Sequence, residues 1–321
     1  MANYTEETCY QNIIDSLILV APFFLLSLAG LFTGTFIVAV NVTDWLKQRT
    51  MTAANQIITS LGLSRIILHI LSIIDLFFTV CSEDPFETSS VLFFIYVTAV
   101  FSTVWLSVLL FFFFCFTIST FRSVFFLRLK TIISQRVTSL IIVFLLLSFG
   151  FPVMTFLMVP LLPCSGNSTE DDSSCDRQTD QFLTTLYAVW NFFPLLVFFI
   201  SSILLVISLS SHVNRMKTRT NETSNTGTFY RTITFTVVSF LTFAFYITVA
   251  VAASFDLKAT IPYFIDNIFP TLHSLTLIYV TTKLKNQFLQ VICCKVECLF
   301  SRKAPEPNSR VQVEMIHIPR M

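Results

Sequence analysis

Charged residues and glycine are both scarce in this chain. Only 12% of the 321 residues are Asp, Glu, Lys or Arg, and six are glycine, whereas a soluble domain usually carries about 25% charged residues. Hydrophobic residues make up 54% of the chain, and phenylalanine occurs 37 times. A water-soluble chain of this length cannot bury that much apolar surface. The apolar residues also come in long runs instead of amphipathic stripes, so the composition predicts an integral membrane protein.

Motifs of enzymes and metal sites are missing as well. The sequence has no HExxH, GxSxG, P-loop or CxxC pattern, and its four histidines are scattered at positions 69, 212, 273 and 317. Cys293, Cys294 and Cys298 lack the further ligands that a zinc site needs. The net charge of +1 by itself says nothing about a nucleic-acid partner, and we expect none. We therefore expect no enzyme activity, no cofactor and no bound metal.

Seven stretches are long and apolar enough to cross a bilayer as helices, which takes about 20 residues each. They lie at roughly 13–40, 53–80, 89–119, 137–160, 183–211, 231–253 and 262–282. The last stretch is the least apolar, because it contains Asp266, Pro270, His273 and Ser274. The expected fold is an all-α membrane protein, a seven-transmembrane helix bundle with a short amphipathic helix after the last span.

The basic residues orient this bundle in a plasma membrane. If the N-terminus lies outside, ten Lys and Arg residues fall in the three inside loops and seven in the tail, which makes 17 of the 20. Short cytoplasmic loops of membrane proteins carry such an excess of positive charge. We expect a seven-helix transmembrane domain over residues 1–282, a juxtamembrane helix over 283–303 and a flexible cytoplasmic tail over 304–321.

Several residues outside the helices are candidates for modification. Asn167 begins a glycosylation sequon in the longest outside loop, where a glycan can be attached. Cys9, Cys81, Cys164 and Cys175 face the oxidising side, but the sequence does not decide which of them pair. The three tail cysteines at 293, 294 and 298 suit palmitoylation next to the membrane, and free thiols are the alternative.

Ionisable residues at membrane depth are costly and mark functional or structural sites. Arg65 lies near the middle of the second span. We favour a structural hub that locks the first, second and seventh helices together over direct contact between Arg65 and a ligand. Asp266 lies about one turn into the last span. It is a candidate ligand anchor, and a solvated helix start is the alternative.

The third span carries the aromatic residues that suit an apolar ligand. Trp105 combines a large apolar face with one N–H donor, so it fits an apolar ligand with a polar tip. The run Phe111–Phe114 follows it. Because consecutive residues point to all sides of a helix, only one or two of these four rings can face the interior. The others are expected to contact lipid or to pack against neighbouring helices.

Short motifs in five segments are more specific than composition. The matching residues are Asn41, Asp44 and Trp45; Gln56, Ile57, Leu61, Ser64 and Arg65; Trp105 and Lys130; Pro194, Ser208, Leu209, His212 and Met216; and His273, Ser274, Leu277, Ile278, Lys283, Leu284 and Lys285. In this order and spacing, over about residues 34–286, they resemble the bitter taste receptor family (taste receptors type 2). The DRY and NPxxY motifs of rhodopsin-like receptors are missing.

Some positions depart from the family pattern. Gly34 stands where the family usually has an Asn that binds the central Arg, so Arg65 is expected to rely more on Ser274 and on backbone carbonyls. Tyr246 lies one residue from the usual position of a Tyr switch. Thr281 replaces a usual Asn. The departures indicate a divergent member, of the kind expected in a non-mammalian vertebrate.

The resemblance implies a G-protein-coupled sensory receptor for bitter small molecules that signals through a gustducin-type heterotrimeric G protein. The implied ligand contacts are Trp105, Leu109, Phe112, Tyr263 and Asp266; the activation hub is Arg65, Ser274 and Tyr246; and the G-protein contacts are Arg128, Lys130, His212, Arg215 and Met216. A basic inner surface also suits anionic membrane lipid. The alternatives are a vomeronasal type 1-like chemoreceptor and a small membrane transporter.

Overall fold

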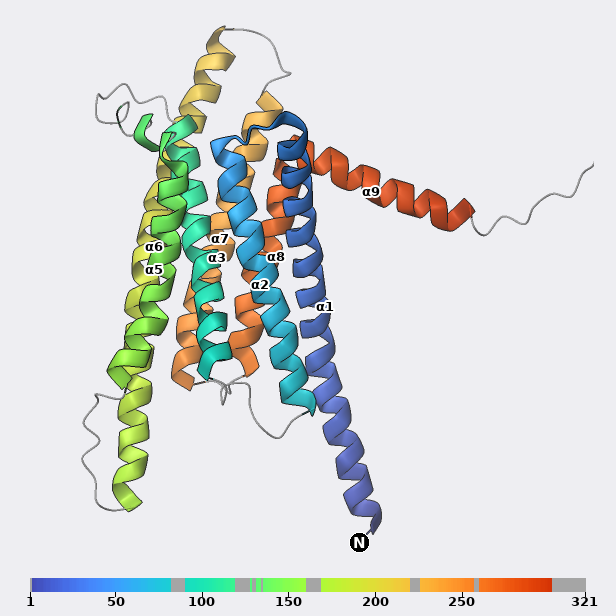
Figure 1. Ribbon diagram of the computed structural model, residues 1–321, viewed down its shortest axis with the longest axis vertical. Coiled ribbons are helices and arrows are strands. Elements are labelled where there is room, and N and C mark those ends of the chain that lie inside the picture. The colour runs from blue at the N-terminus through green and yellow to red at the C-terminus, as the bar shows by residue number, and fades with distance from the viewer. Residues whose placement is uncertain are drawn as a thin grey trace, which may run out of the picture.

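All regular structure that the computed structural model describes is helical (Figure 1). The backbone is described for residues 2–81, 90–118, 128, 131–133, 135–159, 169–219, 226–256 and 260–301, and the side chains for most of these. The helices are α1 (Ala2–Gln48), α2 (Ala53–Cys81), α3 (Ser90–Ile118), α5 (Val137–Met158), α6 (Thr169–Arg219), α7 (Thr226–Asp256), α8 (Thr260–Val280) and α9 (Thr282–Ser301). The tail from residue 302 and Asn167 lie outside the described residues.

Seven of these helices form the transmembrane bundle, and α9 leaves it sideways (Figure 1). Among the described residues, α1, α2, α3, α5 and α6 each contain a segment long and apolar enough to cross a membrane, and α7 contributes the shorter apolar segment Ile233–Val249. The seventh crossing is α8, which packs against α1, α2 and α7. Its polar residues face these neighbours and not lipid, since Asn267, His273 and Ser274 are all fully buried.

The fifth crossing begins earlier than its apolar run. The acidic residues Glu170, Asp171 and Asp172, expected in an outside loop, lie in the first turn of α6, which starts at Thr169. Negative side chains in a first helical turn are stabilised by the partial positive charge of the helix N-terminus. The helix can therefore continue beyond the lipid through a polar segment.

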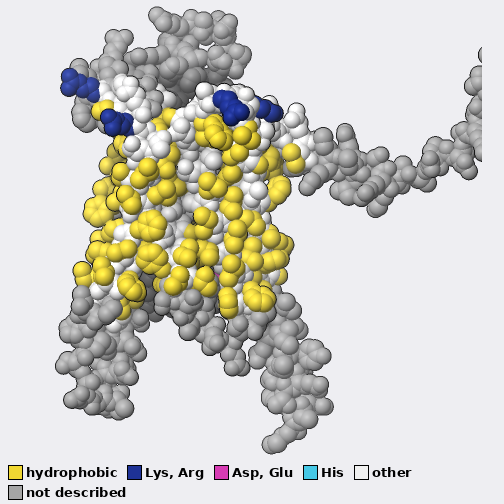
Figure 2. Space-filling model, viewed as in Figure 1, with side chains coloured by type: hydrophobic (Ala, Val, Ile, Leu, Met, Phe, Trp, Pro, Cys, Tyr) yellow, Lys and Arg dark blue, Asp and Glu magenta, His cyan; other side chains and the backbone are white. Residues whose placement is uncertain are grey.

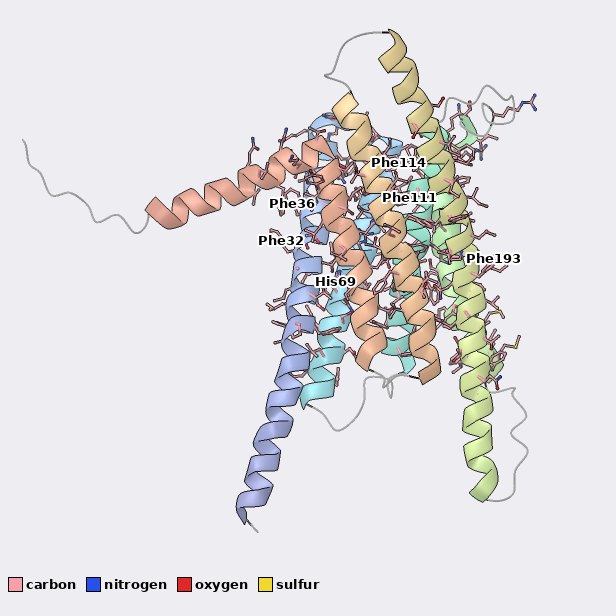
Figure 3. All side chains as sticks on the ribbon, turned by 180° about the vertical axis from the view of Figure 1, so that it is seen from behind. Phe32, Phe36, His69, Phe111, Phe114 and Phe193 are labelled. Atoms are coloured by element: carbon pink, nitrogen blue, oxygen red, sulfur yellow. The ribbon has the colours of Figure 1, made fainter. Side chains whose placement is uncertain are left out.

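Helix α3 lies at the centre of the bundle and packs against α2, α5 and α6. Of its four consecutive phenylalanines, Phe111 and Phe113 are buried, and Phe112 and Phe114 are half-buried. Two of the four rings thus lie in the interior, as expected, and the other two pack against neighbouring side chains of the core. Figure 3 shows Phe111 and Phe114 inside the bundle, whereas Phe193 of α6 points away from it.

Glycine is used where α1 and α2 approach each other closely. A Cβ at Gly30 would overlap the imidazole of His69, and a Cβ at Gly62 would lie 2.7 Å from Val38 Cγ2. Gly34, one helical turn after Gly30, would place its Cβ 3.3 Å from Ile66 Cγ1. Small residues four apart allow helices in a membrane to pack backbone against backbone. These three glycines therefore serve the contact between α1 and α2.

The surface agrees with the orientation expected from the sequence. Figure 2 shows a broad band of apolar side chains on the bundle, with Lys and Arg gathered at the end from which α9 departs. Large exposed apolar residues occur on the outer helices, including Phe156 of α5 and Phe192 of α6. An apolar band with a basic rim on one side is the surface of a membrane-spanning bundle with that rim in the cytoplasm.

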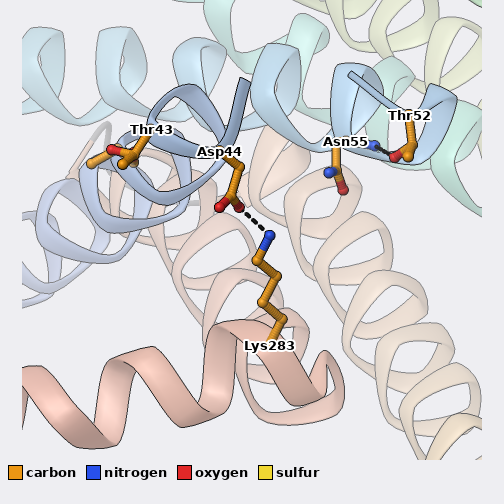
Figure 4. A network of polar contacts seen from close by, with 6 residues as sticks. Thr43, Asp44, Thr52, Asn55 and Lys283 are labelled. Atoms are coloured by element: carbon orange, nitrogen blue, oxygen red, sulfur yellow. Dashed lines mark hydrogen bonds and ion pairs between the residues drawn. The ribbon is translucent and has the colours of Figure 1, made fainter. Parts of the chain in front are cut away.

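At the cytoplasmic end, α9 is held against the last turns of α1. Lys283 forms an ion pair with Asp44 of α1 (Figure 4). Leu284 is buried, and the ring of Phe288 packs on Phe36, with 5.2 Å between ring centroids. The backbone N–H of Asn55 donates to Thr52 Oγ1 over 3.3 Å, which caps the start of α2.

Candidate functional site

A fully buried guanidinium organises the middle of the bundle. Arg65 of α2 is completely buried. Its Nη1 donates to Ser274 Oγ over 2.6 Å, and its Nη2 donates to His273 Nδ1 over 2.6 Å and to Ser107 Oγ over 3.3 Å. Since guanidinium has no acceptor, the Nδ1 atom of His273 must accept. The hub therefore connects α2, α3 and α8 through side chains.

The first helix reaches this hub in a different way from the one expected. The sequence predicted that Arg65 would lock α1 as well as α2 and α8, but Gly34 has no side chain to offer. Instead, α1 presents Gly30 to the ring of His69. His69 Nδ1 and Asn267 Oδ1 are 2.8 Å apart, which joins α2 to α8 about one turn further out. The contact to Ser274 is present, and Ser107 and His273 take the place expected for backbone carbonyls.

A carboxylate with tyrosine partners lies in the outer half of the bundle. The hydroxyl of Tyr246 donates to Asp266 Oδ1 over 3.0 Å, and the hydroxyl of Tyr96 donates to Asp266 Oδ2 over 3.5 Å. Tyr187 of α6 lies near enough to Asp266 and Tyr246 to interact with them electrostatically. We call Asp266, Tyr96, Tyr187 and Tyr246 the outer cluster. Its members come from α8, α3, α6 and α7. The geometry of the outer cluster therefore depends on the relative positions of these four helices.

An aromatic group adjoins the outer cluster. Trp105 is 8% exposed, and its ring packs edge-on against Phe144 of α5 at 5.8 Å between centroids. Phe101 packs on Phe151 at 4.8 Å, and Tyr187 contacts both rings at 5.9 and 5.8 Å. The indole N–H of Trp105 has no hydrogen-bond partner among the described residues. Tyr187 therefore belongs to both groups, and the combined site offers a carboxylate, hydroxyls, aromatic faces and one unused donor.

Aromatic rings connect the hub to α7 below this level. The ring of His273 is caged by Phe269, Phe235 and Phe111, with centroids 5.5, 5.8 and 5.9 Å away. Phe111 also packs on Phe198 of α6 at 4.3 Å. His273, which accepts a hydrogen bond from Arg65, is thus packed against aromatic rings of α3, α7 and α8. A shift of α7 must therefore change the surroundings of the hub.

Comparison with known proteins identifies this architecture. A family model described as Taste receptor protein (TAS2R) matches residues 12–296 of the chain. The chain belongs to this family. Taste receptor type 2 member 7 of the rat is 27% identical to it over 305 residues, which cover 86% of this chain and 95% of that protein. The human taste receptor type 2 member 50 is 28% identical over 286 residues, with coverage of 84% and 94%.

A solved structure shows the same fold. Squid rhodopsin superposes on this taste receptor with a TM-score of 0.60, covering 89% of this chain and 87% of that one at 14% identity. The chain is therefore a divergent taste receptor with the seven-helix bundle of G-protein-coupled receptors, and a multi-pass protein of the plasma membrane. Family membership confirms a receptor instead of an enzyme, and it decides against the vomeronasal and transporter alternatives.

The residues of this taste receptor that the sequence predicted to contact a ligand do not all lie together in the structure. Trp105 and Asp266 lie in adjoining clusters that Tyr187 connects. Leu109 is fully buried in the main core, and Phe112 packs on Phe116 at 4.6 Å between centroids. The side chain of Tyr263 lies outside the described residues.

The three residues predicted to form the activation hub of the taste receptor also do not all lie together. Arg65 and Ser274 are in direct contact, whereas Tyr246 donates to Asp266 in the outer cluster. Of the implied G-protein contacts, Arg128 is exposed. Lys130 and the side chains of His212, Arg215 and Met216 lie outside the described residues.

The sequence of the taste receptor did not predict Tyr96, Tyr187 or Ser107 as residues of the site. It also did not predict a role for His69. The signal for His69 was present, because it lies four residues after Arg65 and therefore on the same helical face. The two tyrosines and Ser107 carry no comparable signal. Each is one polar residue in an apolar helix, and its partner lies on a helix distant in the sequence.

Proposed function

We propose that this receptor detects bitter small molecules at the outer side of the bundle and signals through a gustducin-type heterotrimeric G protein. The observation that supports the proposal is the arrangement of α8. Within nine residues, this helix presents Asp266 to the outer cluster, Asn267 to His69, and His273 and Ser274 to Arg65. A ligand that moves the outer part of α8 therefore acts on groups that are hydrogen-bonded to the central hub.

The direct ligand contacts in this proposal are Trp105, Tyr263 and Asp266. Trp105 supplies an aromatic face and an indole N–H that has no acceptor among the described residues. Leu109 and Phe112 form the packed layer of α3 beneath them and shape the site without a polar contact. The ligand changes the conformational equilibrium only by binding the active state more tightly than the resting state.

On the cytoplasmic side, we propose that the G protein binds the exposed Arg128 together with Lys130, His212, Arg215 and Met216. The domain division that goes with this function is a receptor domain over residues 1–282, the juxtamembrane helix over 283–303 and a tail over 304–321. The ion pair between Asp44 and Lys283 anchors α9 to the bundle. It therefore keeps α9 beside the cytoplasmic face. Glycosylation of Asn167 belongs to the outer side in the same topology.

A cell-based assay tests the proposed function. The full chain, with an epitope tag for surface staining, is co-expressed with a gustducin-type Gα subunit that releases calcium, and a panel of bitter compounds is applied. Agonist-dependent calcium release that disappears without the Gα subunit is the expected result. A receptor that is present at the surface and silent towards the whole panel contradicts the proposal. Exposure of a tag after Met321 on intact cells contradicts the topology.

A further inference from the structure

The carboxylate of Asp266 has no positive partner in the part of the chain that the structure describes. Its described partners are the hydroxyls of Tyr246 and Tyr96. The nearest buried cation on the same path, Arg65, binds Ser274, which is eight residues, or about 12 Å, along α8 from Asp266. A charge away from water is expensive unless it is paired. Among the described residues, the carboxylate of Asp266 therefore has no counter-charge.

The two tyrosines leave much of this carboxylate unused. Each oxygen of Asp266 accepts one described hydroxyl, at 3.0 and 3.5 Å, whereas a carboxylate offers about four acceptor positions. The hydroxyls fix the orientation of the group without neutralising it. Asp266 is only half-buried, while Tyr96 and Tyr246 are buried. No further donor to Asp266 lies among the described residues, so acceptor positions remain for a molecule that enters the outer half of the bundle.

An aromatic cluster adjoins the carboxylate through Tyr187. Tyr187 lies near enough to Asp266 to interact with it electrostatically and packs against Phe101 and Phe151, and Trp105 belongs to the same aromatic cluster. A cation over the face of Trp, Tyr or Phe is attracted by the ring quadrupole, and aromatic cages bind quaternary ammonium groups in this way. A carboxylate beside several such rings is complementary to a positively charged nitrogen with an apolar body.

We propose that the outer cluster selects ligands that carry a positively charged nitrogen, with the nitrogen beside Asp266 and the apolar part of the ligand against the rings of Tyr187, Phe101 and Trp105. This inference rests on the proposed function and adds the ligand class to it. The cationic nitrogen supplies the counter-charge that the described part of the receptor lacks. A neutral ligand of the same shape fills the aromatic space but leaves the carboxylate unpaired, so it binds more weakly.

The first experiment needs no variant of the receptor. An aromatic quaternary ammonium compound is compared with its neutral isostere, in which a quaternary carbon replaces the nitrogen, and both carry the same hydroxyl group for solubility. The permanent charge removes any effect of pH on the ligand. In the calcium assay, the ammonium compound is expected to act at about 10- to 100-fold lower concentration, the size of a desolvated cation–π and Coulomb attraction, since it has no N–H to donate. Equal potency of the two compounds overturns the inference.

Variants then locate the charge effect. Asp266→Asn keeps the size of the side chain and should raise the half-maximal concentration of the ammonium compound about 10- to 100-fold, with little change for the neutral isostere. Asp75→Asn is the matched control, because Asp75 of α2 is also a buried carboxylate, ten residues or about 15 Å along the helix from Arg65 towards the outer side. Equal losses for both ligands in Asp266→Asn, or a loss as large in Asp75→Asn, overturn the inference.

The failure of this inference is distinguishable from failure of the proposed function. Responses to neutral bitter compounds alone overturn the ligand class and leave the receptor function intact. Silence towards every compound, with surface staining at the normal level, contradicts the receptor function itself. If Asp266→Asn does not reach the surface, the comparison of the two ligands on the unmodified receptor still decides the question.

Discussion

The contact between Gly30 and His69 allows a sharp test of the packing described above. In Gly30→Ala the new methyl group would overlap the imidazole of His69, and the ring must move away from Asn267, its partner at 2.8 Å. Overpacking costs about 1–3 kcal/mol, and the weakened interhelical hydrogen bond costs about 0.6 kcal/mol more. Alanine recovers about 0.5–1 kcal/mol because it is the better helix former. We expect a net loss of about 1–3 kcal/mol.

The cause of this loss is tested in a second background. In His69→Ala the obstacle is absent, so adding Gly30→Ala should cost nothing and can stabilise the receptor by about 0.5–1 kcal/mol. The measurement is the apparent melting temperature of the purified receptor in one detergent at one heating rate, because membrane-protein unfolding of this kind is often irreversible. Gly30→Ala alone should lower it by a few degrees.

Gly34→Ala is the control for this experiment. Its Cβ would lie 3.3 Å from Ile66 Cγ1, which needs to move by only a few tenths of an ångström, so a smaller decrease is expected. The reasoning is refuted if Gly30→Ala lowers the melting temperature equally in the presence and absence of the His69 ring. The cost would then come from the backbone of α1 and not from the contact with His69.

Three further changes test the site and its supports. Trp105→Ala should raise the half-maximal concentration of most agonists about tenfold or more at normal surface staining, and unchanged potency across the panel would remove Trp105 from the site. Arg65→Met leaves Ser274 and its other partners without a donor, at about 1–3 kcal/mol for each group that stays unsatisfied, so little receptor should reach the surface; normal surface staining would contradict the hub. Asp44→Lys or Lys283→Asp alone should cost about 0.5–1 kcal/mol, since Lys283 is half-exposed. The double exchange should restore the melting temperature, and a double variant as unstable as the single ones would show that the ion pair contributes nothing.

The membrane topology could be predicted from the sequence because it depends on properties of short segments, namely their total hydropathy and their number of basic residues. Hydropathy over about 20 residues decides whether a segment crosses the bilayer, and the basic residues of short loops decide its direction. Neither quantity requires knowledge of which helices are neighbours. The motif around His273 and Ser274 added the family, which the family model over residues 12–296 confirms.

The rotation of each helix could not be predicted in the same way. In α3 nearly every residue is apolar, so hydropathy does not vary around the helix and does not show which side faces α5 or α8. The placement of Trp105 against Phe144 follows from the packing of complete helices. For the same reason, the sequence assigned Tyr246 to the hub, although its hydroxyl donates to Asp266.

The polarity of α8 made it the least certain span in the sequence and makes it the connecting helix in the structure. A lipid-facing helix gains nothing from Asp266, Asn267, His273 or Ser274, because each polar group costs free energy in hydrocarbon. These residues are retained on α8 beside partners on α2, α3 and α7. Packed helices change between discrete arrangements and do not deform continuously. In the proposed function, a ligand that binds at Asp266 and moves α8 also changes the contacts of Arg65.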